Sequence, residues 1–507
     1  MEQKLTDVVI VGAGPVGLML AIELTLGGAR VIVLERLSNP DETIKAGAIG
    51  ALAGEALERR GFEPAMDAEE RIMSETMAAL FKTMAPTAGR PAVRKIGGHF
   101  SGLFLIDQTR QREPARRLRG IRQQPLEQML NAKAQALGID VRRNVELLDF
   151  SQDDSGVAVV AVGPDGEMPL RCQYLIGCDG GRSRVRKQAG FGFPGTDPTI
   201  TGYQALVELD HPERLLPLGW RRTATGMLAY GPIPGRILTV EFAGAPVDRD
   251  APVTVAEVQA SLRRVSGADV TVTTMKSATR WTDNARQATS YRQGRVLLAG
   301  DAAHVHSPFG GQGLNLGLLD AVNLGWKLAA VVRGTMPDGL LDSYTDERHP
   351  VAVRVLANTR AQVALMRPDP QTSALREIVA DIMALDEGNR FFGEMMSGVA
   401  IRYDLDDPHP LVGRISGDIE LVYDETMLFE LMQAGNAVLL DAGTGAASAL
   451  AGPWQPQVRV VRVERGPSLL VRPDGCIAWA SEADALDGLK AALVRWFGEG
   501  RPLEGTA

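Results

Sequence analysis

Cysteine is scarce in this sequence. The 507 residues contain three cysteines, Cys172, Cys178 and Cys476, and they are widely spaced. An odd and scattered set of this kind forms neither a disulfide framework nor a thiolate metal site. The scarcity fits a reducing compartment, so we expect a cytoplasmic protein.

An excess of positive charge is also missing. The chain has 54 Lys and Arg against 62 Asp and Glu, a formal net charge of −8. Nucleic-acid and anionic-membrane binding surfaces need a basic footprint. We therefore expect neither nucleic acid nor a membrane as a partner.

A long uninterrupted apolar run is the third absence. The most apolar stretch, VVIVGAGPVGLMLAIELTLGG at residues 8–28, contains Glu23 and several glycines. This pattern predicts a buried strand, a turn and a helix instead of a membrane span. With 45% hydrophobic and 23% charged residues, the length predicts a globular, enzyme-sized chain of about three domains.

The same stretch carries a dinucleotide-binding motif. Gly12, Gly14 and Gly17 have GxGxxG spacing between a predicted strand at 8–11 and a predicted helix at 18–26. The glycines permit a tight turn, approach of a pyrophosphate and close helix–strand packing. The next predicted strand ends at Glu35, where a carboxylate would bind a ribose hydroxyl. The motif alone leaves FAD and NAD undistinguished.

Two further motifs follow predicted strands. QYLIGCDGGRSRVRKQAG places Asp179 and Gly180 before a helix, and GRVLLAGDAAH places Asp301 at the carboxyl end of a buried strand. Open α/β sheets bind ligands at such strand ends. The glycine loop after Asp301 opens a helix whose N-terminus would stabilise negative charge on a docked ring. A second nicotinamide-binding unit is missing, so any nicotinamide cofactor should bind transiently.

These three motifs, in this order, resemble the class A flavoprotein monooxygenases of the para-hydroxybenzoate hydroxylase-like group. The resemblance implies that Glu35 binds the adenosine ribose of FAD, Asp301 binds the ribitol, and Leu314 and Asn315 meet the flavin pyrimidine edge through backbone groups. Lys45 stands where many relatives place Arg beside the flavin. The predicted FAD-binding residues are Gly12, Gly14, Pro15, Val16, Gly17, Glu35, Arg36, Lys45, Ala46, Arg122, Gln123, Leu147, Asp179, Gly180, Asp301, Pro308, Gly311, Gly313, Leu314 and Asn315.

The histidines beside Asp301 do not predict a metal site. His304 and His306 straddle Val305, so in an extended loop they point in opposite directions, and no third nearby ligand completes a zinc set. We interpret His304 as a hydrogen-bonded loop organiser. His306 could face the flavin or substrate, and its role as a general base stays open. No catalytic side chain is assigned, because the flavin is the reagent.

The predicted fold is α/β. A Rossmann-like FAD-binding domain is expected from residues 1–70, 119–187 and 285–395, and a β-sheet substrate domain from 71–118 and 188–284. Segments such as GPSLLVRPDGCIAWA resemble the aromatic polyketide hydroxylase branch, which implies a thioredoxin-like module at 410–507. Because Cys476 stands alone without a CxxC motif, we expect this module to serve packing or dimerisation. A monomer or homodimer is expected.

The resemblance also implies the chemistry. NADPH or NADH would transiently reduce FAD, and a C4a-hydroperoxyflavin formed with O2 would hydroxylate a polycyclic aromatic polyketide of antibiotic biosynthesis. One alternative is Baeyer–Villiger oxygen insertion by the anionic peroxide. Another is a flavin-fold protein that binds an aromatic drug or pigment without turning it over.

Overall fold

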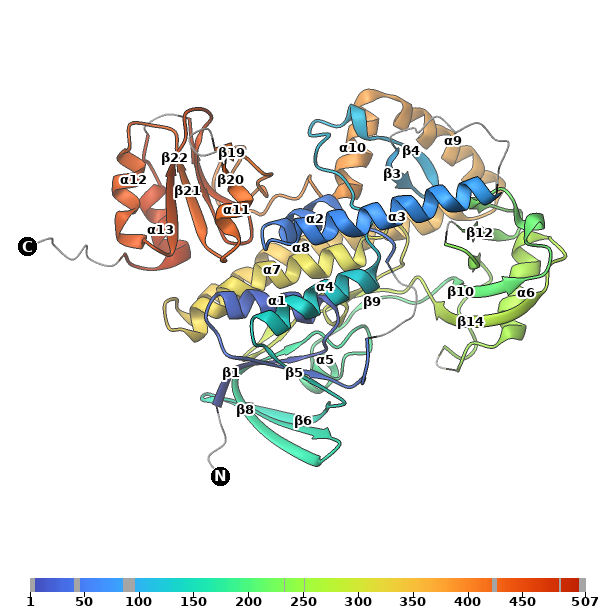
Figure 1. The fold of residues 1–507 in the computed structure, drawn as a ribbon, viewed down its shortest axis with the longest axis horizontal. Helices are drawn as coiled ribbons and strands as arrows, with labels where there is room; N and C mark the ends of the chain where they lie inside the picture. The colour runs from blue at the N-terminus through green and yellow to red at the C-terminus, as the bar shows by residue number, and fades with distance from the viewer. Residues whose placement is uncertain are drawn as a thin grey trace, which may run out of the picture.

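The first structural unit is an eight-stranded sheet that carries the three motifs (Figure 1). The computed structural model describes residues 5–40, 46–84, 96–231, 233–249, 251–421, 426–482 and 485–500. The sheet has the order β16 (Arg292–Gln293), β17 (Val296–Leu298), β8 (Gly166–Gly177), β1 (Leu5–Val11), β2 (Val31–Glu35) and β5 (Asp140–Arg143), and β6 (Glu146–Asp153) and β7 (Gly156–Gly163) extend it beside β8. Strands β17, β8, β1, β2 and β5 are parallel. Their carboxyl ends therefore share one edge of the sheet.

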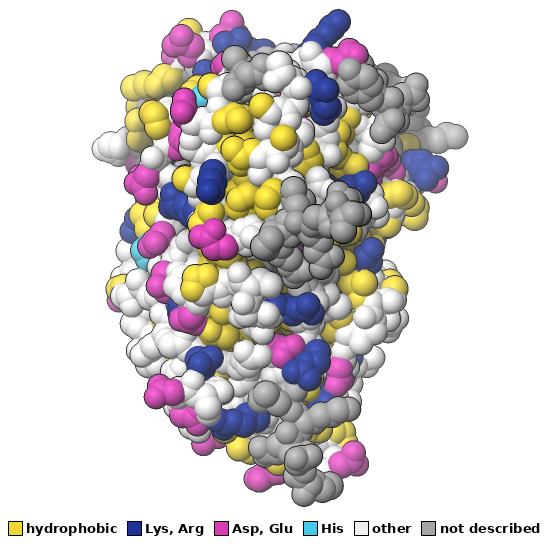
Figure 2. Space-filling model, turned by 90° about the vertical axis from the view of Figure 1, so that its left-hand side faces the viewer, with side chains coloured by type: hydrophobic (Ala, Val, Ile, Leu, Met, Phe, Trp, Pro, Cys, Tyr) yellow, Lys and Arg dark blue, Asp and Glu magenta, His cyan; other side chains and the backbone are white. Residues whose placement is uncertain are grey.

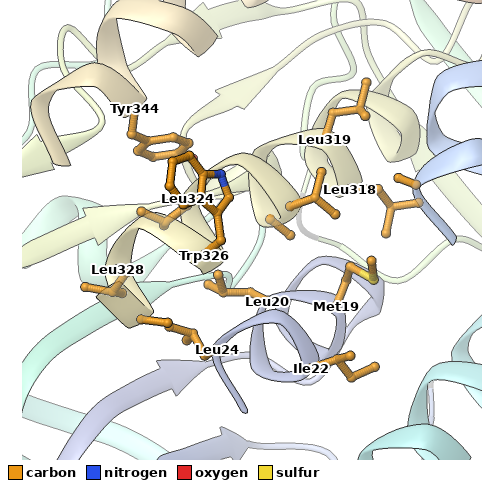
Figure 3. Close-up of a cluster of buried hydrophobic side chains, with 14 of the residues drawn as sticks. Met19, Leu20, Ile22, Leu24, Leu318, Leu319, Leu324, Trp326, Leu328 and Tyr344 are labelled. Atoms are coloured by element: carbon orange, nitrogen blue, oxygen red, sulfur yellow. The ribbon is translucent and has the colours of Figure 1, made fainter. Parts of the chain in front are cut away.

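Two long helices, α1 (Pro15–Leu26) and α7 (Gly313–Val332), pack closely on this sheet. A Cβ added at Gly325 would lie 2.3 Å from the Cβ of Glu23, so the helices touch where α7 has no side chain. Figure 3 shows Leu20 and Leu24 of α1 and Trp326 and Leu328 of α7 pointing toward one another. This apolar contact fixes the N-termini of both helices relative to the strand ends.

Further helices surround the pair. They are α2 (Ala51–Glu58), α3 (Glu63–Met84), α4 (Gln123–Ala136), the short α5 (Arg184–Gln188) and α8 (Asp342–Met366). Helix α3 runs without a break across residue 70, the predicted end of the first FAD-domain segment.

A five-stranded antiparallel sheet forms the second unit. Its order is β11 (Gly219–Arg222), β12 (Gly226–Tyr230), β13 (Arg236–Glu241), β10 (Thr201–Leu209) and β14 (Val272–Trp281). On β10, Tyr203 and Ala205 belong to the apolar cluster under helix α6 (Val255–Ser266), whereas Gln204 between them lines a cavity on the opposite face. The alternation leaves one face for the core and one for a ligand.

Within 71–84 and 96–118, the described part of the segment predicted for the substrate domain, no strand joins that sheet. Strands β3 (Ile96–Phe100) and β4 (Leu103–Asp107) pair with each other and pack on helices α9 (Pro370–Ala384) and α10 (Asp386–Ser397). A small sheet of β9 (Gly195–Thr196), β15 (Ala285–Gln287) and β18 (His304–Val305) joins the two larger units. The division of the chain into domains stays a prediction.

The C-terminal unit has its own four-stranded sheet, at the left of Figure 1. The sheet order is β22 (Val458–Arg462), β21 (Ala437–Asp441), β23 (Ser468–Val471) and β24 (Ile477–Ser481), with β21 and β22 parallel and the other pairs antiparallel. The hairpin of β19 (Glu420–Leu421) and β20 (Thr426–Met427) and the helices α11 (Leu428–Met432), α12 (Ala446–Ala451) and α13 (Leu489–Phe497) complete it.

Figure 2 views the molecule from the side on which this unit lies. Lys and Arg are interspersed with Asp and Glu on the visible face, and hydrophobic side chains gather on its upper part. Among the helices of the described residues, none has the length and apolar character needed to cross a membrane.

Candidate active site

The turn between β1 and α1 leaves space for a phosphate group. The Gly12 N–H donates to the Leu34 carbonyl at 2.7 Å, and a Cβ at Gly12 would lie 2.4 Å from the Cys178 carbonyl oxygen. A Cβ at Gly17 would lie 1.9 Å from the Gly12 oxygen, whereas a Cβ at Gly14 would meet no atom within 4 Å. Gly12 and Gly17 are needed for packing, whereas Gly14 faces open space at the N-terminus of α1. A helix N-terminus of this kind binds anions.

Glu35 is held at the end of β2. Its Oε2 accepts the Ala13 N–H at 2.8 Å, and its Oε1 accepts the Leu37 N–H at 2.9 Å. These bonds tie the carboxylate to the glycine turn. A cavity of about 570 Å³ runs from Glu35 past Gly14 to Asp301 and Leu314. Its walls include the predicted residues Gly12, Pro15, Val16, Arg36, Gln123, Leu147, Asp179, Gly180 and Gly313.

The two carboxylate oxygens of Asp179 have different surroundings. Its Oδ2 accepts the backbone N–H groups of Arg184 and Val185 at 2.7 and 3.2 Å, at the start of α5. Its Oδ1 is buried and has no hydrogen-bond partner among the described residues. A buried acceptor that lines a cavity is available to a hydrogen-bond donor from a ligand or from water.

Asp301 follows β17 and faces solvent-accessible space. Its carboxylate makes no hydrogen bond to the residues that the structure describes, and it lines both this cavity and a larger one of about 1000 Å³. Gln123, Gly313 and Leu314 also line both, so the two cavities meet at the N-terminus of α7. A ligand as long as a dinucleotide can extend from Glu35 into the larger cavity.

Asn315 contributes its backbone to the cavity, because its side chain is already engaged. Its Oδ1 accepts the Gly50 N–H at 2.7 Å, and its Nδ2 donates to the Gly311 carbonyl at 2.8 Å. Gly311 has φ +63°, which favours glycine. The first turn of α7 thus presents backbone N–H groups to the cavity.

The remaining predicted cofactor residues lie around this junction. Ala46 and Pro308 line the larger cavity. Gln123 begins α4, donates its N–H to Ala46 at 3.1 Å and donates from Nε2 to Glu127 at 2.8 Å. The Nε of Arg122 is buried without a hydrogen-bond partner among the described residues. Lys45 lies outside the residues that the structure describes.

The two histidines have different surroundings. His304 Nε2 lies 2.6 Å from Asp320 Oδ2 in the protein interior, and His304 does not line the larger cavity. His306 does line it, with Nδ1 2.8 Å from the Ser307 carbonyl, to which it donates. Its Nε2 is buried without a partner among the described residues. Burial lowers the pKa of His306, so the imidazole is neutral and Nε2 is an acceptor.

Metal ligands do not gather here. Within the described ranges, no group of three or more His, Cys, Asp or Glu side chains could hold a metal ion.

The sequence analysis missed the side chains on the far wall of the larger cavity. Arg236 on β13 donates to Gln204 Oε1 on β10 at 3.0 Å, and burial lowers the pKa of this guanidinium. His99 on β3 accepts the Gly102 N–H at Nδ1, at 3.3 Å, and burial lowers its pKa to about 4. A neutral imidazole that accepts at Nδ1 carries its proton on Nε2. No motif marks these residues; the polar Gln204 between the apolar Tyr203 and Ala205 of β10 was the available signal.

Comparison with known proteins identifies the family. Residues 5–359 match the FAD binding domain family, and residues 409–500 match the aromatic-ring hydroxylase C-terminal family. The chain belongs to the FAD-dependent aromatic-ring hydroxylases. The solved structure of an anhydrotetracycline hydroxylase from Streptomyces rimosus superposes with a TM-score of 0.85 at 39% identity, over 98% of this chain and 100% of that one.

Two curated relatives of the present chain differ in their named activities. A 12-dehydrotetracycline 5-monooxygenase/anhydrotetracycline 6-monooxygenase of Streptomyces rimosus is 40% identical over 97% of this chain and 99% of its own length. A dialkyldecalin synthase of Streptomyces rugosporus is 37% identical over 97% of this chain and 98% of its own length.

The family, the α/β fold, FAD as the cofactor with NAD(P)H as reductant, and the monooxygenase class are thereby confirmed. The cavity fits FAD, because its lining combines the open space at Gly14, an Asp179 oxygen without a partner among the described residues, and the Asp301 carboxylate. The assignment of individual residues to groups of FAD stays a prediction.

Proposed function

We propose that this hydroxylase acts on a polycyclic aromatic polyketide that carries two or more oxygen substituents. The observation that supports this most is the larger cavity, about 1000 Å³, whose walls include Trp220, Trp281 and Phe309. The rings of Trp281 and Phe309 are 5.4 Å apart and nearly perpendicular, and Trp220 lies 6.1 Å from Phe309. Aromatic walls of this kind favour a flat, fused-ring ligand.

Two polar groups would orient this ligand. Arg236 has no carboxylate partner among the described residues, so its guanidinium would bind an ionised phenol or enol oxygen. His99, through Nε2–H, would donate to a ring carbonyl. A substrate held at two points presents a defined ring carbon to the flavin.

Residues near α7 would act on the end of the substrate that receives the oxygen atom. FAD, when bound, accepts electrons from NAD(P)H and transfers one oxygen atom of O2 to the substrate. The N-terminus of α7 stabilises negative charge that develops on the ring system placed against it. His306 would accept a hydrogen bond at Nε2, and its lowered pKa favours positioning over proton abstraction.

A second candidate function is cyclisation or binding without oxygen transfer. The relative named a dialkyldecalin synthase favours it, because that name contains no oxidation step. Baeyer–Villiger insertion is a third outcome on the same site. The three differ in where, and whether, an oxygen atom from O2 enters the product.

The experiment uses purified holoenzyme, NADPH or NADH, ¹⁸O2 and a panel of anhydrotetracycline, 1-hydroxyanthraquinone and 1-anthrol. We expect substrate-stimulated NAD(P)H oxidation and one ¹⁸O in a new ring hydroxyl, detected by mass spectrometry and NMR. Label within an expanded lactone ring would identify Baeyer–Villiger chemistry instead. No stimulated oxidation and no label across the panel, or an isomeric product without label, would contradict the proposal.

A further inference from the structure

A chain of buried charged side chains connects the C-terminal unit with the loop that carries Asp301. Its centre is a pair of adjacent residues on α8, Glu347 and Arg348, whose side chains are at most 3% exposed. Each bonds to a different part of the molecule. Neither side chain lines the two cavities described above.

Glu347 binds the C-terminal unit through hydrogen bonds. Its two carboxylate oxygens accept two hydrogen bonds of 2.7 Å from the guanidinium of Arg472, which follows β23. Lys327 and Asn323 of α7 donate to the same carboxylate at 2.9 and 2.6 Å. The Arg472 guanidinium also packs 4.4 Å from the ring centre of Trp496 in α13. A paired, parallel contact of this kind fixes both position and orientation.

Arg348 continues the chain toward the flavin site. Its Nε donates to Asp320 Oδ1 at 2.8 Å, and its Nη2 donates to the Leu316 carbonyl in the first turns of α7 at 3.0 Å. Asp320 Oδ2 in turn accepts the Gly300 N–H at 3.1 Å and contacts His304. Gly300 immediately precedes Asp301, so these bonds hold the loop from residue 300 to residue 304 against α7.

The network is closely balanced in charge. Three carboxylates, Asp320, Glu347 and Asp474, face three cations, Lys327, Arg348 and Arg472. Removing one partner from a buried network leaves the others uncompensated and strongly disfavours the arrangement. Loss of Arg472 would leave Lys327 as the one remaining cation of the network beside Glu347 and Asp474. The α7–α8 interface would therefore have to rearrange.

We propose that the C-terminal unit is a positioning element of the flavin site. Arg472, acting through Glu347, Arg348 and Asp320, holds the Asp301 loop and the first turn of α7 in the geometry that binds FAD. This assigns a role to a unit whose single cysteine, Cys476, lies buried and unpaired. This role depends on FAD being the cofactor. It does not depend on which substrate the protein binds.

The test compares four full-length variants with the parent protein. Arg472→Met removes the charge, Arg472→Lys keeps the charge without the fork, and Glu347→Gln/Arg472→Met restores the charge balance of the network, with two carboxylates facing two cations. Trp454→Phe is the control: it loses a 2.8 Å bond to Gly498 inside the C-terminal unit and shares no hydrogen bond with the network. Apoproteins are titrated with FAD by flavin fluorescence, and the thermal midpoint of each apoprotein and the flavin reduction potential are measured.

We expect Arg472→Met to raise the Kd for FAD about tenfold or more and to shift the reduction potential, with Arg472→Lys intermediate. The double variant should recover part of the lost affinity, because Asp320 and Asp474 then face two cations, Lys327 and Arg348. Trp454→Phe should lower the thermal midpoint with the Kd unchanged. An unchanged Kd in both Arg472 variants would overturn the proposal, as would an equal rise in Trp454→Phe. If Arg472→Met does not fold, Arg472→Lys and the double variant decide by the same criteria.

Discussion

Asp301 is a carboxylate at a strand end with no hydrogen-bond partner among the described residues. Asp301→Ala should therefore leave the stability of the apoprotein within about 0.5 kcal/mol of the parent value. It should weaken FAD binding, because charge-assisted bonds to ribitol hydroxyls contribute roughly 1.5–3 kcal/mol. The flavin-to-protein ratio after purification measures this, and Asp301→Asn serves as the isosteric comparison. Undiminished flavin content would contradict a ribitol role.

Arg236 is a buried guanidinium that bonds to Gln204. Arg236→Met should raise the KM for an ionised polycyclic phenol roughly tenfold or more, since a charge-assisted bond of about 1.5–3 kcal/mol is lost. It should leave the Kd for FAD unchanged. Steady-state kinetics with product quantification checks both, and Arg249→Ala, an exposed arginine lining the same cavity, is the control. An equal effect of both substitutions would argue against a specific anchor.

His99 makes stability depend on pH. Burial lowers its pKa to about 4, whereas an exposed histidine titrates near 6.5. Between about pH 4 and 6.5 the unfolded chain binds the proton and the folded protein does not, so the free energy of unfolding rises with pH there. This group adds a slope of at most about 1.4 kcal/mol per pH unit.

In urea unfolding at several pH values, His99→Gln should flatten this slope, and stability lost on acidification toward pH 4 should decrease. His211→Asn, at a histidine whose side chain is 56% exposed, should leave the slope intact. A slope that persists in His99→Gln would assign the effect to other groups.

Helices α1 and α7 form the element contact on which the site depends. Gly325 permits their approach, since its Cβ would lie 2.3 Å from the Glu23 Cβ, and Glu23 is itself bound to Arg60 at 2.7 Å. Gly325→Ala should destabilise the protein by about 1–3 kcal/mol through overpacking. Gly339→Ala, where a Cβ would meet no atom within 4 Å, is the matched control. Equal unfolding midpoints in urea for the two variants would refute this contact.

In the whole molecule, the substrate cavity forms where separate units meet. Its walls come from β3, from the five-stranded sheet, from the loop before α7 and from α10. FAD bound across the β1–α1 turn, Asp179 and α7, as the motifs predict, should therefore stabilise the whole fold. At a free concentration of one hundred times its Kd, FAD should add about 2.7 kcal/mol to the free energy of unfolding. Urea titrations of apo- and holoprotein measure this, and an identical midpoint would contradict a cofactor shared between elements.

The cofactor half of the site could be predicted from short motifs in the sequence, and the assignment of each residue to a group of FAD stays a prediction. Gly12 is needed for a turn with positive φ, Gly17 for a helix that packs against a strand, and Asp301 for a carboxylate at a strand end. Short windows of sequence express each of these local requirements. Tertiary structure decided the rest. Gln204 meets Arg236 through the pairing of β10 with β13, His99 lines the same cavity from β3, and Arg472 reaches Glu347 across 125 residues. Such contacts depend on which faces pack together, and no local pattern encodes that choice.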